Sequence, residues 1–178
     1  MKVILASTSP RRKELLKQIF PVFSVVSPSA EEAETGDPKT LAVENAVKKG
    51  RSVREECDVL LSCDTVVALD GKIYGKPKDD FDAVKMLTEL SGKTHSVVSG
   101  VYLKINGKEV SFYEESFVKM KKMTHQEIVD YIRTYRPLDK AGAYGIQDET
   151  VVEGYEGEYE NIVGLPIAKT RRAIERNL

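Results

Sequence analysis

The sequence predicts an α/β fold in which helices flank a mixed β-sheet. Short apolar runs alternate with helical patterns along most of the chain, which favours strands joined by helices. A long hairpin around the turn Asn106-Gly107 adds antiparallel strands. The 178 residues suit one compact unit, and we expect residues 1–178 to form a single domain.

Composition excludes several classes of protein. The 27 basic and 28 acidic side chains leave a net charge of −1, so no overall field attracts nucleic acid or an acidic membrane. No apolar run is long enough for a membrane span or a secretory signal, and we expect a cytoplasmic protein. Cys57 and Cys63 lie beside apolar positions in no redox or zinc spacing, which predicts buried free thiols.

The first strand and helix form the most informative stretch. The apolar run Val3–Ala6 predicts a buried strand, and Ser9 followed by Pro10 predicts the cap and first turn of a helix that ends near Phe20. Ser7, Ser9, Arg11 and Arg12 then place hydroxyls and guanidinium groups beside that helix start, a combination suited to phosphate oxygens. The alternative is an ordinary capped helix with a solvated basic first turn.

A short strand over Phe23–Val26 and an acidic loop follow. The loop carboxylates, which belong either to a solvated connection or to a metal site, are Glu31, Glu32 and Glu34. A helix is predicted from Pro38 to about Arg54, and Lys48 and Lys49 near its middle are expected in solvent, as lysine usually is.

The apolar run Val59–Leu69 predicts a buried strand that Asp64 and Thr65 interrupt. A carboxylate in such a strand is ordinarily paired, bound to a metal or poised for proton transfer. If Asp64 has no partner, its replacement by Asn should not lower the stability of the fold. If Asp64 is paired with a lysine, for which Lys76 is the candidate, the same replacement should destabilise the protein. The turn Asp70-Gly71 leads to a short strand and then to the loop Gly75-Lys76-Pro77.

Predicted helices and strands also alternate in the second half of the chain. Helical periodicity covers 79–91, the hairpin strands cover 96–105 and 109–120, and a capping box at Thr124 opens a helix to about Tyr135. His95 and His125 have no visible partner, so neither is assigned to catalysis. A last helix is predicted after Gly164-Leu165-Pro166.

The stretch 139–147 is rich in small residues, which allow the backbone to approach a ligand or another element closely. It ends in Gln147, whose amide both donates and accepts hydrogen bonds. Together, seven segments resemble the Maf family of nucleoside triphosphate pyrophosphatases in order and spacing. They are Ser7-Thr8-Ser9-Pro10-Arg11-Arg12, Glu32, Lys49, Asp64-Thr65, Gly75-Lys76-Pro77, Asp139-Lys140-Ala141-Gly142-Ala143-Tyr144-Gly145-Ile146-Gln147 and Gly164-Leu165-Pro166.

The resemblance implies two lobes around a cleft and hydrolysis of a nucleoside triphosphate to monophosphate and pyrophosphate with Mg²⁺ or Mn²⁺. It also allows for a homodimer. The branch of the family that acts on 7-methyl-GTP has Trp, Gln and Glu where this chain has Arg11, Thr65 and Gln147, so all three positions resemble the dTTP/UTP branch. The chain departs from the family at Gly50, where Ala generally follows the lysine.

Site roles follow from the same resemblance. Phosphate binding is implied for Ser7, Ser9, Arg11 and Arg12; charge neutralisation for Lys49 and Lys76; substrate recognition for Thr65 and Gln147; metal binding for Glu32. Asp64 is implied as proton acceptor, but a metal ligand remains open, because aspartate is a weak base and a metal does most of the activation of water. A nucleotide-binding regulator of septum formation without turnover is the alternative of a different class.

Overall fold

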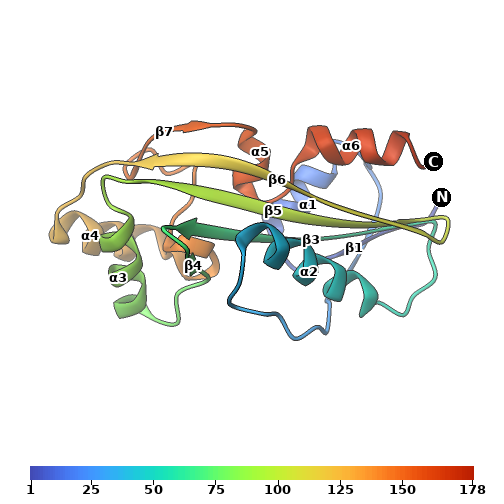
Figure 1. Ribbon diagram of the computed structural model, residues 1–178, viewed down its shortest axis with the longest axis horizontal. Coiled ribbons are helices and arrows are strands. Elements are labelled where there is room, and N and C mark those ends of the chain that lie inside the picture. The colour runs from blue at the N-terminus through green and yellow to red at the C-terminus, as the bar shows by residue number, and fades with distance from the viewer.

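The computed structural model describes residues 1–178 and contains one mixed, seven-stranded sheet (Figure 1). The strand order is β2-β1-β3-β5-β6-β7, with β4 also paired to β3. The strands are β1 (Val3–Ala6), β2 (Ser24–Val26), β3 (Val59–Leu69), β4 (Lys72–Tyr74), β5 (Thr94–Ile105), β6 (Lys108–Met120) and β7 (Val152–Glu156). The helices are α1 (Pro10–Leu16), α2 (Pro38–Arg51), α3 (Asp80–Leu90), α4 (His125–Tyr135), α5 (Tyr159–Val163) and α6 (Ile167–Glu175).

The sheet combines parallel and antiparallel pairing, which confirms the predicted class. β1 runs parallel to both β2 and β3, whereas β3, β5, β6 and β7 are antiparallel neighbours. The turn between β5 and β6 places Asn106 and Gly107 at φ 48° and 84°, the left-handed conformations that a tight two-residue hairpin requires. Both hairpin strands are one or two residues longer at their starts than the sequence pattern predicts.

One edge of β3 is interrupted at its middle. β1 pairs with Val59–Ser62, β4 pairs with Val67–Leu69, and β5 covers the opposite edge from Val59 to Ala68. Residues 63–66 therefore have no neighbouring strand on the first edge. We call this interruption the edge gap, and it contains Asp64 and Thr65.

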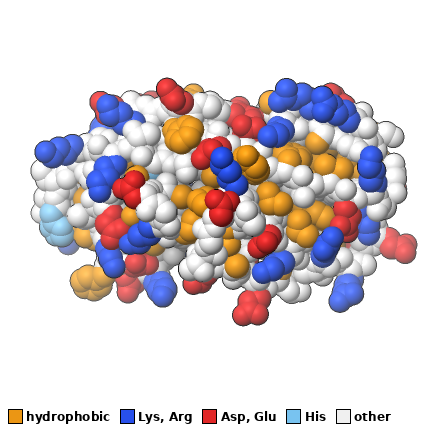
Figure 2. All heavy atoms as spheres, in the orientation of Figure 1, with side chains coloured by type: hydrophobic (Ala, Val, Ile, Leu, Met, Phe, Trp, Pro, Cys, Tyr) orange, Lys and Arg blue, Asp and Glu red, His pale blue; other side chains and the backbone are white.

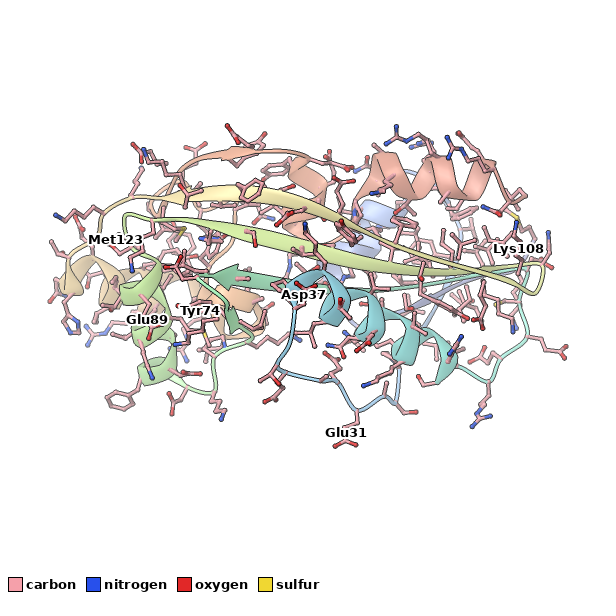
Figure 3. All side chains as sticks on the ribbon, viewed as in Figure 1. Glu31, Asp37, Tyr74, Glu89, Lys108 and Met123 are labelled. Atoms are coloured by element: carbon pink, nitrogen blue, oxygen red, sulfur yellow. The ribbon has the colours of Figure 1, made fainter.

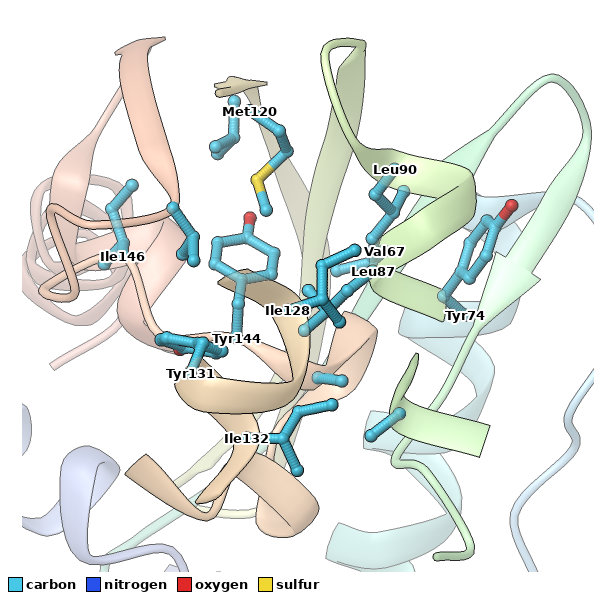
Figure 4. Close-up of a cluster of buried hydrophobic side chains, with 14 of the residues drawn as sticks. Val67, Tyr74, Leu87, Leu90, Met120, Ile128, Tyr131, Ile132, Tyr144 and Ile146 are labelled. Carbon is cyan, nitrogen blue, oxygen red and sulfur yellow. The ribbon is translucent and has the colours of Figure 1, made fainter. Parts of the chain in front are cut away.

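Two large apolar cores lie at the two ends of the long strands. One is built around α1, α6 and the paired ends of β1 and β3, and includes Leu5, Leu16 and Leu61. The other packs α3, α4 and the segment 143–151 against the far ends of β3, β5 and β6 (Figure 4). We call the part built around the first core the first lobe and the part built around the second core the second lobe. Because β3, β5 and β6 run through both cores, the two lobes share one continuous sheet, and the edge gap lies between them.

Helix α2 covers the opposite face of the sheet from α1 and α6 (Figure 1). It packs on β3 and β5 through Leu41, Ala42 and Ala46, which are all buried. Asp37 caps its start by accepting a hydrogen bond from the Thr40 N–H at 3.0 Å. The helix ends at Arg51, three residues before the predicted end.

Several predicted boundaries are wrong. Helix α1 ends at Leu16, not near Phe20, because residues 17–19 tighten into turns such as Ile19 N–H to Leu16 C=O at 2.9 Å. The sequence pattern gave no signal for β7, for α5 or for the 3₁₀ turns Pro137–Asp139 and Ala141–Ala143. The Thr124 capping box is present, with hydrogen bonds in both directions to Glu127.

Charge is spread over the surface. Figure 2 shows acidic and basic side chains interspersed over most of one face, with the densest basic group over α6. No helix is both long and apolar enough to cross a bilayer. Cys63 is buried, as predicted, but Cys57 is only half-buried because it lies in the loop that leads to β3.

Candidate active site

A cleft of about 500 Å³ opens at the edge gap, between the two lobes. A smaller pocket of about 220 Å³ adjoins it around residues 6–12. The two cavities share seven polar residues, which are Ser9, Arg11, Arg12, Glu32, Lys49, Lys76 and Asp139. The rest of the cleft has a mixed lining, with apolar side chains such as Leu41, Ile73, Met86 and Ile146 and charged ones such as Lys78, Asp82 and Lys140. The end that the cleft shares with the smaller pocket is its most densely charged part, and we call it the charged end.

The charged end centres on an ion-paired triad of Asp64, Lys49 and Glu32. Lys49 Nζ lies 2.7 Å from Asp64 Oδ1 and 3.0 Å from Glu32 Oε1. Asn45 Nδ2 donates to the second oxygen of Asp64 at 3.2 Å. Lys49 is only 7% exposed, so the prediction of a solvated lysine is wrong. Asp64 does have a cationic partner, but that partner is Lys49 and not Lys76.

The geometry of α2 explains this triad. Asn45 and Lys49 are four residues apart, so they lie on one face of the helix, above Asp64 on β3. Two glycines bring the helix unusually close. A Cβ on Gly100 of β5 would overlap the Ala42 backbone, and one on Gly50 would overlap the Tyr102 ring. Gly50, which departs from the family, thus makes room for a buried tyrosine.

Thr65 faces the other side of β3, since side chains alternate along a strand. Its hydroxyl accepts a hydrogen bond from Arg12 Nη2 at 3.0 Å and lies 2.8 Å from Ser99 Oγ. Arg12 also donates from Nε to the Gly164 carbonyl at 2.8 Å. The Arg12 guanidinium is therefore fixed at the edge gap by β3 and by the segment before α6.

Residues 7–11 form the wall of the smaller pocket. Ser7 is buried and its hydroxyl accepts from the Ser9 N–H at 3.2 Å, while Ser9 accepts from the Arg12 N–H at 3.4 Å. Arg11 reaches across the cleft, and its guanidinium donates to Asp139 Oδ2 at 2.9 Å and to the Asp139 carbonyl at 3.3 Å. This Arg11–Asp139 bridge joins the two lobes.

Lys76 comes from the loop after β4 and lines both cavities. It makes no ion pair, so its ammonium is available to a ligand. The neighbouring Gly75 carbonyl accepts a hydrogen bond from the Gly142 N–H at 3.1 Å, which ties this loop to the small-residue stretch. Gly142 adopts φ 73°, a conformation that favours glycine.

Gln147 lines the cleft from the side of the second lobe, and its side chain is exposed. The segment that carries it begins at Tyr144, whose hydroxyl lies 2.7 Å from His95 Nε2. His95 thus has a partner, contrary to the sequence reading, but it is buried in β5 and does not line the cleft. Burial lowers its pKa to about 4, so the ring is neutral at physiological pH.

The donor set suits a cation that phosphates help to hold. Glu32 and Asp64 are within reach of one ammonium, and no group of three His, Cys, Asp or Glu side chains comes together. Mg²⁺ is commonly bound by one or two carboxylates plus substrate phosphates, and these two carboxylates fit that pattern. Glu31 does not take part: Figure 3 shows it pointing away from the sheet.

Sequence reasoning gave no role to three residues of this site, of which only Asp139 was named, as part of a family motif. Asn45 and Ser99 hold Asp64 and Thr65, and Asp139 holds Arg11. The helical spacing between Asn45 and Lys49 was an available signal for the first. Ser99 is identified only by the β3 to β5 register, in which it faces Thr65.

This fold and cleft define a two-lobed α/β protein with a polar cleft at the edge gap, in which four cationic side chains and two carboxylates lie close together. A model of the family described as "Maf-like protein" matches residues 2–177. The chain belongs to the Maf family.

Relatives that are named for an activity support this assignment. The dTTP/UTP pyrophosphatase of Thermosipho africanus is 46% identical over 172 residues, covering 95% of this chain and 90% of that protein. The dTTP/UTP pyrophosphatase of Clostridioides difficile is 46% identical over 178 residues, covering 95% and 91%. The structure of the Staphylococcus aureus Ham1 protein matches all of both chains with a TM-score of 0.58 at 17% identity, which shows a shared fold.

Proposed function

We propose that the protein hydrolyses dTTP and UTP to the nucleoside monophosphate and pyrophosphate. The observation that carries the proposal is that one cleft is lined by Arg11, Arg12, Lys49 and Lys76 together with the Asp64 carboxylate, which Lys49 contacts. Relatives that cover nearly the whole chain are named for this activity.

The phosphates would lie at the charged end. Ser7, Ser9, Arg11 and Arg12 would bind their oxygens, since guanidinium groups and hydroxyls are strong donors to phosphate. Arg12 is already fixed by Thr65 and Gly164, which reduces the entropy lost on binding. Arg11 would exchange Asp139 for phosphate.

The reaction joins water to the α-phosphorus and breaks its bond to the oxygen that leaves with pyrophosphate. Asp64 would take the proton of the attacking water, and Asn45 and Lys49 hold its two oxygens in place. Lys49 and Lys76 would stabilise the negative charge that develops on the transferred and leaving oxygens.

A divalent cation completes the proposal. Glu32 and Asp64 would hold it together with phosphate oxygens, and when bound it would polarise the phosphoryl group and lower the pKa of coordinated water. Asp64 would then share its charge between the cation and Lys49.

The affinity of the wild type for Mn²⁺ should rise in the presence of a non-hydrolysable triphosphate, and Glu32→Gln should lose that rise.

A panel of nucleoside triphosphates with Mg²⁺, followed for pyrophosphate and for orthophosphate, tests the reaction. We expect pyrophosphate as the first product, with dTTP and UTP preferred. Asp64→Asn should abolish turnover, whereas Asp130→Asn on the exposed face of α4 should not. Orthophosphate as the first product, or tight nucleotide binding without turnover, would contradict the proposal; the latter would indicate a nucleotide-binding regulator.

A further inference from the structure

A buried tyrosine outside the cleft holds the turn that carries Gln147. Tyr131 lies on α4 and is 4% exposed, with its ring in the core of the second lobe (Figure 4). Its hydroxyl accepts a hydrogen bond from the Gly145 N–H at 3.1 Å and donates one to Asp148 Oδ2 at 2.5 Å. These two partners stand on either side of Gln147, so one hydroxyl bridges both ends of the turn.

The turn is also closed by its own backbone. The Asp148 N–H donates to the Gly145 carbonyl at 3.0 Å, and the Glu149 N–H donates to the Gln147 carbonyl at 3.1 Å. Because Gly145 has no side chain, the side chains of Gln147 and Asp148 can lie close to its Cα. A Cβ there would lie 3.0 Å from Gln147 Oε1 and 3.1 Å from Asp148 Oδ2, so the Gln147 side chain packs against the glycine.

Selectivity for a pyrimidine edge requires such restraint. A freely rotating amide presents its donor and acceptor in either order, so it matches the N3–H and O4 of uracil and the N3 and N4–H₂ of cytosine equally well. Gln147 alone therefore does not distinguish UTP from CTP. Its distance from the phosphate end and the orientation of its amide must both be fixed by its surroundings.

We propose that Tyr131 is a positioning residue that sets base selectivity by holding the Gln147 turn against the cleft. This inference rests on the proposed function, in which Gln147 meets the base. Tyr131 touches no substrate atom in this arrangement and acts only through the turn. Burial first, and then the bond to Asp148, raises the pKa of Tyr131, so the hydroxyl keeps its proton for the carboxylate at working pH.

The chain offers a matched control on the same helix. Tyr135 follows one turn later, its ring centroid lies 4.9 Å from that of Tyr131, and it is 44% exposed. It makes no hydrogen bond to the Gln147 turn. Tyr131→Phe and Tyr135→Phe therefore remove the same atom from neighbouring rings, of which only one holds the turn.

The test measures binding of the α,β-methylene analogues of UTP and CTP by calorimetry, with inorganic tripolyphosphate as a probe of the phosphate end. We expect Tyr131→Phe to reduce the ratio of the two nucleotide affinities by about tenfold, the equivalent of one lost hydrogen bond. The affinity for tripolyphosphate should stay unchanged. Tyr135→Phe should keep the wild-type ratio.

Three further variants show whether Tyr131 acts through the turn. Asp148→Asn keeps an acceptor for the hydroxyl and should retain the ratio, whereas Asp148→Ala should lower it. On a Gln147→Ala background, Tyr131→Phe should have no further effect on the ratio. An equal fall on that background, a parallel loss of tripolyphosphate affinity, an unchanged ratio in Tyr131→Phe, or a wild type that does not discriminate would each overturn the inference.

These readouts separate this inference from the proposed function. Failure of the wild type to release pyrophosphate would contradict the proposed function while leaving the binding ratios measurable. Normal pyrophosphate release with an unchanged ratio in Tyr131→Phe would contradict the role of Tyr131 alone. Melting curves of Tyr131→Phe and Asp148→Asn confirm that the compared proteins are folded.

Discussion

Among single residues, His95 and Asp64 illustrate two ways to bury a titratable group. His95 is neutral, with Nε2 bonded to the Tyr144 hydroxyl and Nδ1 without a partner. Asp64 is held instead by a cation and an amide. The first arrangement couples stability to pH, and the second couples stability to the carboxylate for which we propose the catalytic role.

The buried His95 should make the protein less stable in mild acid. Its pKa is lowered from 6.5 to about 4 in the folded state, so the unfolded chain binds the proton more readily. The stabilisation is complete above pH 6.5 and is lost as the pH falls from there toward 4, by at most about 3 kcal/mol. Urea unfolding of wild type and His95→Asn at pH 7.5, 6 and 5 measures this. If the two proteins lost stability in parallel, another group would be responsible.

Asp64→Asn should lower both activity and stability. The neutral amide leaves the buried Lys49 ammonium with only Glu32, and loss of one partner of a buried pair costs about 3 kcal/mol. This reverses the expectation for an isolated carboxylate, which Asn would relieve. Removing the cation as well, in Asp64→Asn with Lys49→Met, should restore part of the lost stability. A double variant less stable than Asp64→Asn would show that the pair does not act as a unit.

At the scale of elements, the placement of α2 over the sheet decides whether Lys49 reaches Asp64. The close approach depends on Gly100 in β5, which lies against backbone, and on Gly50 in α2, which lies against a side chain. Backbone in a packed helix cannot move without shifting the whole helix, whereas a buried ring and a hydroxyl can make small local shifts. The two glycines should therefore differ in their tolerance to alanine.

Gly100→Ala should destabilise the protein by about 3 kcal/mol, because overpacking forces α2 away from the sheet. Gly50→Ala should cost less, about 1–2 kcal/mol, because the buried Tyr102 ring and the Ser62 hydroxyl must shift but the higher helix propensity of alanine offsets part of that cost. Gly154→Ala in β7 is the control, because a Cβ there meets nothing within 4 Å. Denaturant unfolding gives the three values, and equal costs at Gly100 and Gly50 would contradict the assigned contacts.

The elements also show what sequence patterns detect. Strong signals such as the Asn106-Gly107 turn, the Thr124 capping box and the apolar run of β3 correspond to real elements. β7 and α5 were missed because Val152–Glu156 is a polar edge strand and Tyr159–Val163 spans little more than one turn. Neither has enough periodic apolar residues to be distinguished from a loop.

For the site, individual residue types were informative but their partners were not. Asp64 in an apolar strand predicts a functional carboxylate from physics alone. That Lys49 and not Lys76 neutralises it depends on the closeness of α2 to the sheet, which two glycines on different elements set. Such tertiary distances leave no local signature in the sequence.

On the scale of the whole molecule, the two lobes are joined by shared strands and by the Arg11–Asp139 bridge across the cleft. The bridge occupies a guanidinium that the proposed reaction needs for phosphate. Burial of Asp139 works against ionisation, but hydrogen bonds from Arg11 and Lys140 lower its pKa overall. The Asp139 carboxylate therefore competes with a phosphate ligand for the Arg11 guanidinium.

Asp139→Ala should bind inorganic tripolyphosphate about threefold more tightly than wild type, because an exposed ion pair of this kind is worth less than about 1 kcal/mol. Titration calorimetry at low ionic strength measures the change, and Asp130→Ala provides a control for the loss of one negative charge. Unchanged or weaker binding by Asp139→Ala would show that Arg11 does not exchange partners.

The edge gap has a consequence for backbone dynamics. Between Cys63 and Val66, groups on one side of β3 have no ladder partner, although the same strand is fully paired on its β5 side. In hydrogen–deuterium exchange, amides on this open side should exchange faster than their neighbours along the strand. A nucleotide bound in the cleft should shield these amides from solvent and slow their exchange. Slowed exchange confined to these few amides would therefore report nucleotide occupancy without any measurement of turnover.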